Sequence, residues 1–454
     1  MDRRQFIASL AAGSAIGLTG PLPAFGAAIV NVVVVGGGMA GTTAAKYLKL
    51  WGASSGLDVR VTLIDANAAY VSCIMSNKVL TGETTLSALT YRYTKLAGRG
   101  VTVVQGQVAS VDKTNRVVTL ADGRTYPYTR LILAPGIDFD YSALAISARG
   151  LTLDQALAAV PHAWKAGPQT TELRRQLLAL TNGNRVVMTI PAAPYRCPPG
   201  PYERACAIAG WLKANRPKSK LIVLDANAKI IAEPVNFGRA FSETYRTVIE
   251  YYPGVTVKGV TWDSATPKLK TVSLLDAGGA SVTMPAEVVN LIPPQKAGRV
   301  VIDTLGPTGL SANGRWALVD EISYESKMFP GIHVIGDAIN SKQPKAGHIG
   351  NQEAKICADA ILRLGSGRAP YAAPVTNSAC FTPITPTTAT WLTAVYRYQT
   401  DIDPATGQSL GTKSMQMVSG SPVGVASETP TGASGDNADA MKKWFAALMV
   451  DTFG

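Results

Sequence analysis

The chain has 454 residues, of which 46% are hydrophobic and 16% are charged, and 43 Lys and Arg against 31 Asp and Glu give a net charge of +12. This composition excludes a disordered chain, a collagen-like fibre and a small disulfide-stapled scaffold, and the length predicts about three domains. No apolar run reaches the length of a membrane span and the basic residues are dispersed. We therefore expect no integral membrane segment in the mature chain and no nucleic-acid partner.

Residues 1–28 are predicted to be an export signal. Arg3 and Arg4 stand together before Phe6, a weakly apolar run and a stretch of small residues that offers cleavage sites. Adjacent arginines followed by Phe-Ile resemble a twin-arginine signal, a route that carries folded proteins, often with a cofactor bound. A plain Sec signal or an uncleaved anchor is the alternative. We expect a periplasmic protein, in a compartment that permits disulfides.

A dinucleotide-binding motif opens the mature chain. The β-branched run at 29–35 predicts a buried parallel strand, and a helical pattern occupies 42–50. Between them stands Gly-x-Gly-x-x-Gly. Gly36 permits the tight turn, Gly38 lets the backbone approach a pyrophosphate, and Gly41 allows close packing of helix on strand. A strand, a glycine turn and a helix in this order predict a phosphate-binding loop.

An acid and two later segments identify the dinucleotide. A second strand ends at Asp65, in position to hold ribose hydroxyls. A strand-to-turn segment containing Ala134 and Gly136, and a strand ending in Gly-Asp at Asp337, resemble elements of flavoproteins with two dinucleotide-binding domains. That resemblance implies that Asp337 binds the ribityl chain or pyrophosphate, and that a helix from about Asn351 points its positive end at the flavin. The predicted cofactor is FAD.

The place of a second nucleotide loop is occupied by prolines. Strands are predicted at 185–190 and 221–224, and the segment between them, 191–201, is rich in proline and contains Cys197. Prolines lack the N–H donors that a phosphate needs and fix φ away from the glycine turn. We therefore expect poor binding of a pyridine nucleotide. A helix is predicted from about Tyr202, and a cysteine at a helix N-terminus is expected to have a lowered pKa.

Longer strings of sequence carry a more specific resemblance. They are Pro-His-Ala-Trp-Lys-Ala-Gly at 161–167, Arg-Cys-Pro-Pro-Gly-Pro-Tyr-Glu-Arg-Ala at 196–205, Asn-Leu-Ile-Pro-Pro-Gln at 290–295 and Asp-Thr-Phe-Gly at 451–454. With them the chain resembles the flavoprotein subunit of flavocytochrome c sulfide dehydrogenase from about residue 30 to its end. The sulfide:quinone oxidoreductases are more distant relatives.

The resemblance implies roles for particular residues. FAD is attached through a thioether to Cys73, which stands in Tyr-Val-Ser-Cys; a buried, unreacted cysteine is the alternative. A redox-active disulfide joins Cys197 and Cys380, with a purely structural disulfide as the alternative. Glu203 is a general base, or else only a capping residue that interacts with the helix dipole.

The implied activity is the oxidation of hydrosulfide to sulfane sulfur or polysulfide through that disulfide. Electrons then pass via FAD to a c-type cytochrome subunit. Arg196 and Arg204 are expected to favour the anionic sulfide and thiolate. Two alternatives stay open: an accessory flavoprotein of a thiosulfate-oxidising complex, and a membrane-bound sulfide:quinone oxidoreductase, because the C-terminal segment is modestly amphipathic.

The remaining cysteines and the histidines have simpler interpretations. Cys206 and Cys357 are predicted to pack in the core, although a pairing between them stays open. The three histidines, His162, His333 and His348, are far apart in the sequence. We expect them to be structural, with a contact near the flavin as a second option for His348, and we expect no metal centre.

The predicted fold class is α/β, with two Rossmann-like dinucleotide-binding domains in a glutathione-reductase-like arrangement and a C-terminal α+β interface domain. The FAD-binding domain is discontinuous, at 29–160 and 290–370. The second domain, without an NAD site, is inserted at 161–289. Residues 371–454 are expected to cover the flavin and to form the interface with the partner.

Overall fold

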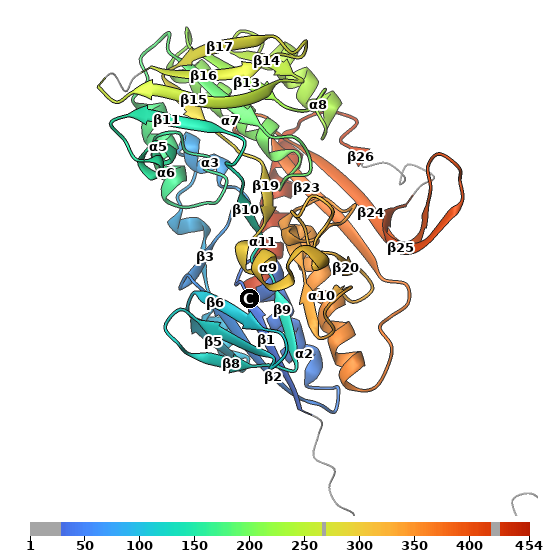
Figure 1. Cartoon of the computed structure of the whole chain (residues 1–454). Helices are drawn as coiled ribbons and strands as arrows, with labels where there is room; N and C mark the ends of the chain where they lie inside the picture. Colours follow the sequence, from blue (N-terminus) through green and yellow to red (C-terminus); the bar gives the residue numbers. More distant parts are fainter. Residues whose placement is uncertain (1–28, 266–268, 419–426) are drawn as a thin grey trace, which may run out of the picture.

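The computed structural model describes residues 29–265, 269–418 and 427–454, so the predicted export signal lies outside the described residues. Three bodies of secondary structure can be followed in Figure 1. The domain predicted to bind FAD lies at the bottom of that view and the inserted domain at the top. The long antiparallel strands of the C-terminal domain run along one side of both.

The first domain is built on a seven-stranded sheet with a strand order that is not the order of the chain. The order is β20 (Val319–Asp320), β21 (Glu325–Ser326), β22 (Ile332–Val334), β9 (Arg130–Leu133), β1 (Ile29–Val35), β2 (Asp58–Asp65) and β5 (Val101–Gln105). The strands from β22 to β5 pair in parallel, and the edge from β20 to β22 is antiparallel. The phosphate-binding loop therefore leaves a strand in the middle of the sheet.

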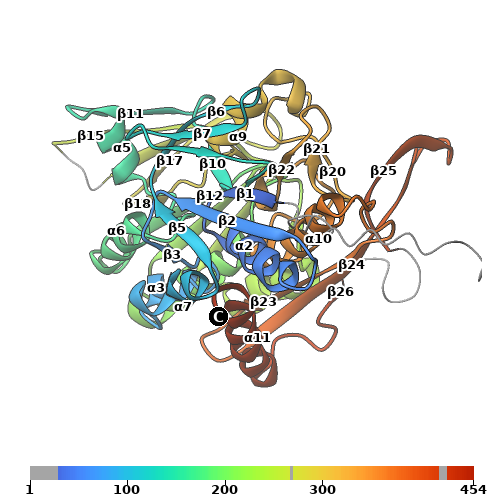
Figure 2. The ribbon, with the colours of Figure 1, turned by 90° about the horizontal axis from the view of Figure 1, so that it is seen from below.

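Layers on both faces bury this sheet. Helices α2 (Met39–Gly52) and α10 (Gly347–Gly365) pack together on one face, and the small sheet of β6 (Val108–Asp112), β7 (Val117–Leu120) and β8 (Thr125–Pro127) lies on the other, as Figure 2 shows. Val32, Val33 and Val34 are at most 1% exposed. A strand buried on both faces needs the continuous apolar run that the sequence has here.

Smaller elements complete the first domain. They are β3 (Ala69–Val71) and β4 (Thr90–Arg92), which pair, and the helices α3 (Asn77–Thr81), α4 (Thr94–Gly98) and α9 (Arg299–Leu305). The short strands β10 (Ile137–Phe139) and β19 (Gln295–Ala297) pair where the chain leaves the domain and where it returns.

The inserted domain has a parallel sheet and an adjoining mixed sheet. The parallel sheet has the order β14 (Ile249–Pro253), β13 (Lys220–Asp225), β12 (Arg185–Ile190) and β18 (Val288–Asn290). The mixed sheet has the order β11 (Ala145–Arg149), β15 (Thr256–Asp263), β16 (Lys270–Leu275) and β17 (Ser281–Ala286). The helices are α5 (Leu153–Ala159), α6 (Pro168–Leu178), α7 (Gly200–Asn215) and α8 (Pro234–Arg239), and a π-helical turn follows at 240–244.

The boundary at 160 is wrong, because the chain enters the inserted domain earlier. β11 pairs in parallel with β15, and Ile146 and Ala148 are buried in the core that the two sheets of this domain share. The first part of the FAD-binding domain therefore ends soon after β10, near residue 140.

The C-terminal domain is an antiparallel sheet with one long helix. Its elements are β23 (Val375–Pro383), β24 (Ala389–Ile402), β25 (Ser409–Met417), β26 (Ser427–Glu428) and α11 (Gly435–Phe453). The end of α11 returns to the first domain, where Phe453 stacks on Tyr70 and Tyr91 with ring centroids 5.2 Å apart in each pair. Lys46 donates to the carbonyl oxygens of Val450 and Asp451.

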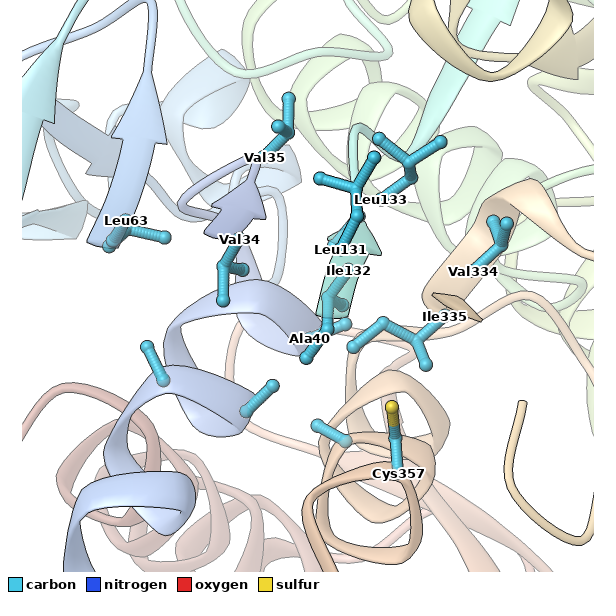
Figure 3. Close-up of a cluster of buried hydrophobic side chains, with 14 of the residues drawn as sticks. Val34, Val35, Ala40, Leu63, Leu131, Ile132, Leu133, Val334, Ile335 and Cys357 are labelled. Atoms are coloured by element: carbon cyan, nitrogen blue, oxygen red, sulfur yellow. The ribbon is translucent and has the colours of Figure 1, made fainter. Parts of the chain in front are cut away.

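Cys206 and Cys357 pack in two different cores, so they do not pair. Figure 3 shows the Cys357 sulfur pointing from α10 towards the strands of the first domain, close to Ile335. Cys206 is buried in the core of the inserted domain. The prediction that both are packing residues is confirmed.

Candidate functional site

The glycine loop after β1 has the close contacts expected of a nucleotide-binding turn. Gly36 has φ +105°, and a Cβ there would lie 2.3 Å from the Ala134 carbonyl oxygen. A Cβ on Gly41 would lie 1.9 Å from the Gly36 carbonyl oxygen. Both obstacles are backbone atoms, so only glycine fits at these two positions.

The N-terminus of α2 is left open towards a ligand. Gly38 is the N-cap residue, no side chain caps the helix, and its first turn contains no acid. A Cβ on Gly38 would meet only Tyr70, at 3.9 Å. Unpaired N–H groups in open space suit a phosphate. The Gly37 N–H donates to Asp65 Oδ2 at 2.5 Å, which fixes the acid at the end of β2 beside the loop.

One cavity of about 490 Å³ starts at this loop and extends between the domains. It brings together most of the residues that the sequence singled out. The predicted residues that line it are Gly36, Gly38, Asp65, Cys73, Ala134, Gly136, Cys197, Glu203, Asp337 and Cys380.

Two predicted cofactor-binding residues lie elsewhere. Gly41 does not line the cavity and serves the packing of α2 on the loop, as predicted. Asn351 is a correction, because α10 begins at Gly347 and Asn351 is therefore inside the helix. Its amide donates to Thr43, Asp451 and Thr452, so it anchors the C-terminal tail.

The polar groups that line the cavity suit the two polar parts of FAD, its phosphates and its flavin ring edge. The first turns of α2 and α10 contain no acidic residue, so both positive helix ends are available to a ligand. Asp337 is half-buried near Arg196 and Lys345, and desolvation raises the pKa of its carboxyl. Within the described part of the chain, the buried indole N–H of Trp444 at the cavity has no acceptor. These groups suit the phosphates, ribityl hydroxyls and polar ring edge of a flavin nucleotide.

Cys197 lies in the proline-rich loop before α7. Its backbone has φ +58°, its N–H donates to the Lys345 carbonyl oxygen at 2.6 Å, and its own carbonyl oxygen accepts from Gly200. Burial raises the pKa of the Cys197 thiol well above its usual range; Cys380 and Glu203 raise it further and Arg196 opposes them. The predicted lowering of this pKa is wrong, because burial and nearby acidic groups outweigh the helix N-terminus.

The five cysteines are free thiols in this structure. Cys197 and Cys380 nevertheless line the same cavity, and Cys380 acts on the ionisation of Cys197. The fold therefore brings the two cysteines of the predicted disulfide, which are far apart in the sequence, to one cavity.

Glu203 faces the cavity rather than capping its helix. It lies in the first turn of α7, where no side chain makes a cap bond. Its Oε1 accepts from Asn77 Nδ2 at 2.8 Å. Burial raises the pKa of this carboxyl to about 7, and the bond from Asn77 partly offsets that effect. A carboxyl that titrates near neutral pH suits a general base.

Arg204 connects three parts of the molecule and is 1% exposed. Its guanidinium donates to Asn77 Oδ1, to Asn290 Oδ1 and to the carbonyl oxygens of His162 and Ala163. It also lies over the Trp164 ring, 4.6 Å from the centroid. Arg204 and Arg196 both line the cavity. The donors of Arg204 are committed to these acceptors, so its role is structural, whereas Arg196 lowers the pKa of Cys197.

We predict that Arg204→Ala lowers the stability by about 3 kcal/mol or more, because it leaves several buried acceptors without a donor. The thermal unfolding midpoint of the flavin-bound protein should fall by roughly 3–5 °C. Arg149→Ala removes an arginine side chain that is 85% exposed and is the matched control, with a change of less than about 0.5 kcal/mol. Equal midpoints for the two variants would contradict the structural role.

The second nucleotide site is filled by side chains. Asp225, at the end of β13, is fully buried. Its Oδ2 accepts from the hydroxyls of Tyr202 and Tyr251 at 2.8 Å each, and its Oδ1 accepts from Asn227. The acid that a ribose would need at this place is therefore already satisfied. This agrees with the proline-rich loop that stands where a phosphate-binding turn would be.

The C-terminal domain brings residues to the cavity that the sequence analysis missed. Trp444 of α11 lines it beside His348, and Phe381 of β23 packs against Trp444. His348 Nδ1 accepts from the Ala379 N–H, and burial lowers its pKa to about 4. No local signal in the sequence indicated the place of Trp444, because that place depends on how α11 packs in the tertiary fold. In the described part of the chain no cluster of His, Cys, Asp and Glu could hold a metal ion.

Comparisons with known proteins show a likeness to a broad class of oxidoreductases and, over part of the chain, to a narrower group within it. Residues 30–173 match the family model of the pyridine nucleotide-disulphide oxidoreductases. The sulfide:quinone oxidoreductase of Aquifex aeolicus superposes with a TM-score of 0.67 at 16% identity, over 93% of this chain and 92% of that one. The covalent putidaredoxin reductase–putidaredoxin complex gives 0.57 at 20% identity, over 81% of each chain. The fold is that of the FAD-dependent members of this class, as predicted.

Residues 170–293 match the family model described as the central part of the sulfide dehydrogenase [flavocytochrome c] flavoprotein chain. The predicted resemblance to that protein is confirmed. Mitochondrial sulfide:quinone oxidoreductase of Mus musculus is 24% identical over 319 residues, which are 68% of this chain and 66% of that enzyme. Rubredoxin-NAD(+) reductase of Pseudomonas putida is 32% identical over 107 residues, 23% of this chain and 27% of that protein.

Proposed function

We propose that this chain is a periplasmic, FAD-dependent sulfide dehydrogenase that passes its electrons to a c-type cytochrome subunit. The observation that carries the proposal is the single cavity in which Cys197, Cys380 and Glu203 face the FAD-binding loop. The filled second nucleotide site supports it, since electrons must then come from a donor other than a pyridine nucleotide. The match to the sulfide dehydrogenase flavoprotein supports sulfide as that donor.

In the proposed reaction a hydrosulfide ion attacks one sulfur of a Cys197–Cys380 disulfide. A new S–S bond forms and the old one breaks, which leaves a persulfide on one cysteine and a thiolate on the other. Glu203 accepts the proton that the bound sulfur species gives up, and Arg196 attracts the anion to the cavity. FAD, when bound, supplies a two-electron acceptor that can release electrons singly to a cytochrome.

Cys73 is the proposed point of covalent attachment of the flavin. It is only partly buried and lines the cavity close to Tyr70 and the glycine loop. We predict that acid precipitation leaves the flavin bound to the wild-type protein and releases it from Cys73→Ser, as followed by the absorbance of pellet and supernatant. Release from both proteins would contradict the attachment.

A quinone-linked enzyme is the second candidate, favoured by the likeness to the mouse and Aquifex aeolicus proteins. Among the described residues no helix is both long and apolar enough to span a bilayer. Three large apolar residues of α11, Leu448, Met449 and Phe453, are buried in the protein's own core, and Val450 is the large apolar residue of this helix that is exposed. This packing favours a soluble acceptor.

Anaerobic titration of the flavin with sulfide, with NADH as the control donor, tests the proposal. We expect bleaching by sulfide alone, followed by reoxidation with cytochrome c and not with a soluble quinone. Bleaching by NADH would contradict the interpretation of the second nucleotide site. Bleaching by neither donor would favour an accessory flavoprotein of a thiosulfate-oxidising complex.

The pH dependence of the sulfide reaction should report Glu203. Because burial raises the pKa of its carboxyl to about 7, the fraction ionised rises through neutral pH and the rate of flavin reduction should rise with it. Glu203→Gln should lower the rate about a hundredfold and flatten this limb. Dividing the rate by the concentration of hydrosulfide ion removes the contribution of the substrate's own ionisation to the pH profile. An unchanged limb in the variant would exclude Glu203 as the base.

A further inference from the structure

Glu203 lines two cavities. Besides the cavity that begins at the glycine loop, it lines a second one of about 210 Å³, between α3, α7 and the loop at 383–386. Asn77, Glu203 and Pro383 are common to both cavities. Space on two sides of a side chain leaves more than one rotamer open to it. Packing alone therefore does not fix the direction of the Glu203 carboxyl.

A single hydrogen bond holds this carboxyl. Asn77 Nδ2 donates to Glu203 Oε1 at 2.8 Å, and within residues 29–265, 269–418 and 427–454 it is the one hydrogen bond or ion pair that the carboxyl makes. Asn77 is buried and is the first residue of α3, which packs against α7. The bond thus joins the first domain to the inserted domain. The direction of the carboxyl depends on which way the Asn77 amide faces.

The Asn77 amide can face only one way. Its Oδ1 accepts from Arg204 Nε at 2.9 Å. A guanidinium has donors and no acceptor, so the amide oxygen must point to Arg204 and the amide nitrogen must point away from it. That nitrogen faces Glu203, and the Gly200 carbonyl oxygen lies 3.5 Å from it. A flipped amide would set an oxygen against these two acceptors.

Arg204 is itself held in place by the rest of its donors. Its Nη1 donates to the His162 carbonyl oxygen and to Asn290 Oδ1, and its Nη2 donates to the Ala163 carbonyl oxygen at 2.6 Å. The Asn290 amide is oriented in the same manner, because its nitrogen donates to two backbone carbonyl oxygens. Donors and acceptors are therefore determined along the whole buried network, from the backbone through the guanidinium to Asn77.

The ionisable groups that interact with Glu203 come from several elements. They are Arg204 and Cys206 of α7, Lys78 of α3, Glu83 after α3, Cys197 of the proline-rich loop, Glu233 before α8 and Cys380 of β23. Desolvation has the largest effect on the pKa of Glu203 and favours the neutral acid. Of the effects that lower this pKa, the bond from Asn77 is the largest, ahead of the two cations.

We propose that Asn77 is a positioning residue, which directs the Glu203 carboxyl and stabilises its ionised form, and that Arg204 fixes the direction of the Asn77 amide. The inference rests on the proposed function, in which Glu203 is the general base. Asn77 stands four residues after Cys73, the proposed point of flavin attachment. One short segment of the first domain then places both the flavin and the base.

Infrared titration of the flavin-bound protein tests the role of Asn77. The band of the protonated Glu203 carboxyl is the band that Glu203→Gln removes, and in the wild type it should titrate near pH 7. In Asn77→Asp one oxygen still accepts from Arg204, but the other has no hydrogen to donate and brings a negative charge to Glu203. We expect the titration to move about one pH unit or more higher. An unchanged titration would overturn the proposal.

Asn290→Asp is the matched control, because it makes the same chemical change at another partner of Arg204. It should leave the titration of Glu203 unchanged. Asn77→Ala removes the donor without adding a charge, so it should shift the titration in the same direction by less, and it decides the matter if Asn77→Asp does not fold. Equal shifts in Asn290→Asp and Asn77→Asp would show a general effect of the network and would also overturn the proposal.

The rate of flavin reduction by sulfide separates this inference from the proposed function. If Glu203 is the base, the rising limb of the pH profile should move with the carboxyl titration, and Asn77→Asp should react at least about fivefold more slowly than the wild type at pH 7. A shifted titration with an unshifted limb would support the role of Asn77 and contradict Glu203 as the base. Because the titration is measured without sulfide, it holds whatever the substrate is.

Discussion

Cys197→Ser and Cys380→Ser should each abolish reduction of the flavin by sulfide while the flavin stays bound. The two sulfurs come from the loop before α7 and from β23, and both line the cavity beside the FAD-binding loop. If one of the two sulfurs is missing, no disulfide can form for the hydrosulfide ion to attack. We therefore expect the rate of flavin reduction to fall at least about a thousandfold. Anaerobic stopped-flow measurement of flavin absorbance gives the rate, and the ratio of flavin to protein absorbance gives occupancy.

Cys206→Ala is the matched control for these two variants. Cys206 lies on α7, the helix that follows the loop of Cys197. It is fully buried in the core of the inserted domain and does not line the cavity. Its removal should leave the sulfide reaction within about twofold and cost some stability. Rapid flavin reduction in either Cys197→Ser or Cys380→Ser would refute the disulfide route.

Local patterns predicted the part of the site that local structure determines. The glycine loop, its strand and its helix follow from residues that are neighbours in the sequence, and Gly36, Gly38 and Gly41 have the roles that their spacing indicated. The start of α10 was misplaced for a related reason. The helix begins at Gly347 after the N-cap residue Ala346, and no capping side chain marks that start in the sequence, so the prediction began the helix about one turn late, at Asn351.

The electrostatics of the site could not be predicted from sequence, because they depend on burial and on distant segments. The loop before α7 suggested a reactive Cys197 of low pKa, but desolvation in the folded protein raises that pKa, and Cys380 and Glu203 raise it further. Glu203 shows the same limit. Its partner Asn77 lies more than a hundred residues away, and only the packing of α3 against α7 joins them.

At the second nucleotide site, the sequence and the structure both indicate that a pyridine nucleotide no longer binds. The prolines after β12 predicted that the phosphate-binding turn is lost. The structure adds that Asp225, the acid at the end of β13, is held by Tyr202 and Tyr251, which come from a helix and a strand on either side of it. A domain that keeps its parallel sheet and fills its ligand site with aromatic side chains serves as a scaffold, here for the loop that carries Cys197.

Gly41→Ala should separate the binding of the flavin from the chemistry of the cysteines. The added Cβ would lie 1.9 Å from the Gly36 carbonyl oxygen and 3.3 Å from the Ala134 Cβ. A backbone oxygen cannot move aside without shifting α2 away from the turn that holds the phosphates. We expect a protein purified with less than about a tenth of the wild-type flavin, and a loss of stability of about 3 kcal/mol, at the upper end for an overpacked site.

Gly98→Ala is the control for this change, because Gly98 lies in a helix of the same domain and a Cβ there meets nothing within 4 Å. It should leave flavin content unchanged and raise stability slightly. In Gly41→Ala, Cys197 and Cys380 should form the proposed disulfide as in the wild type, since both residues lie on other domains, and counting free thiols under denaturing conditions measures it. Full flavin content in Gly41→Ala would show that α2 can move without losing its ligand, and would place the main phosphate contacts outside the glycine loop.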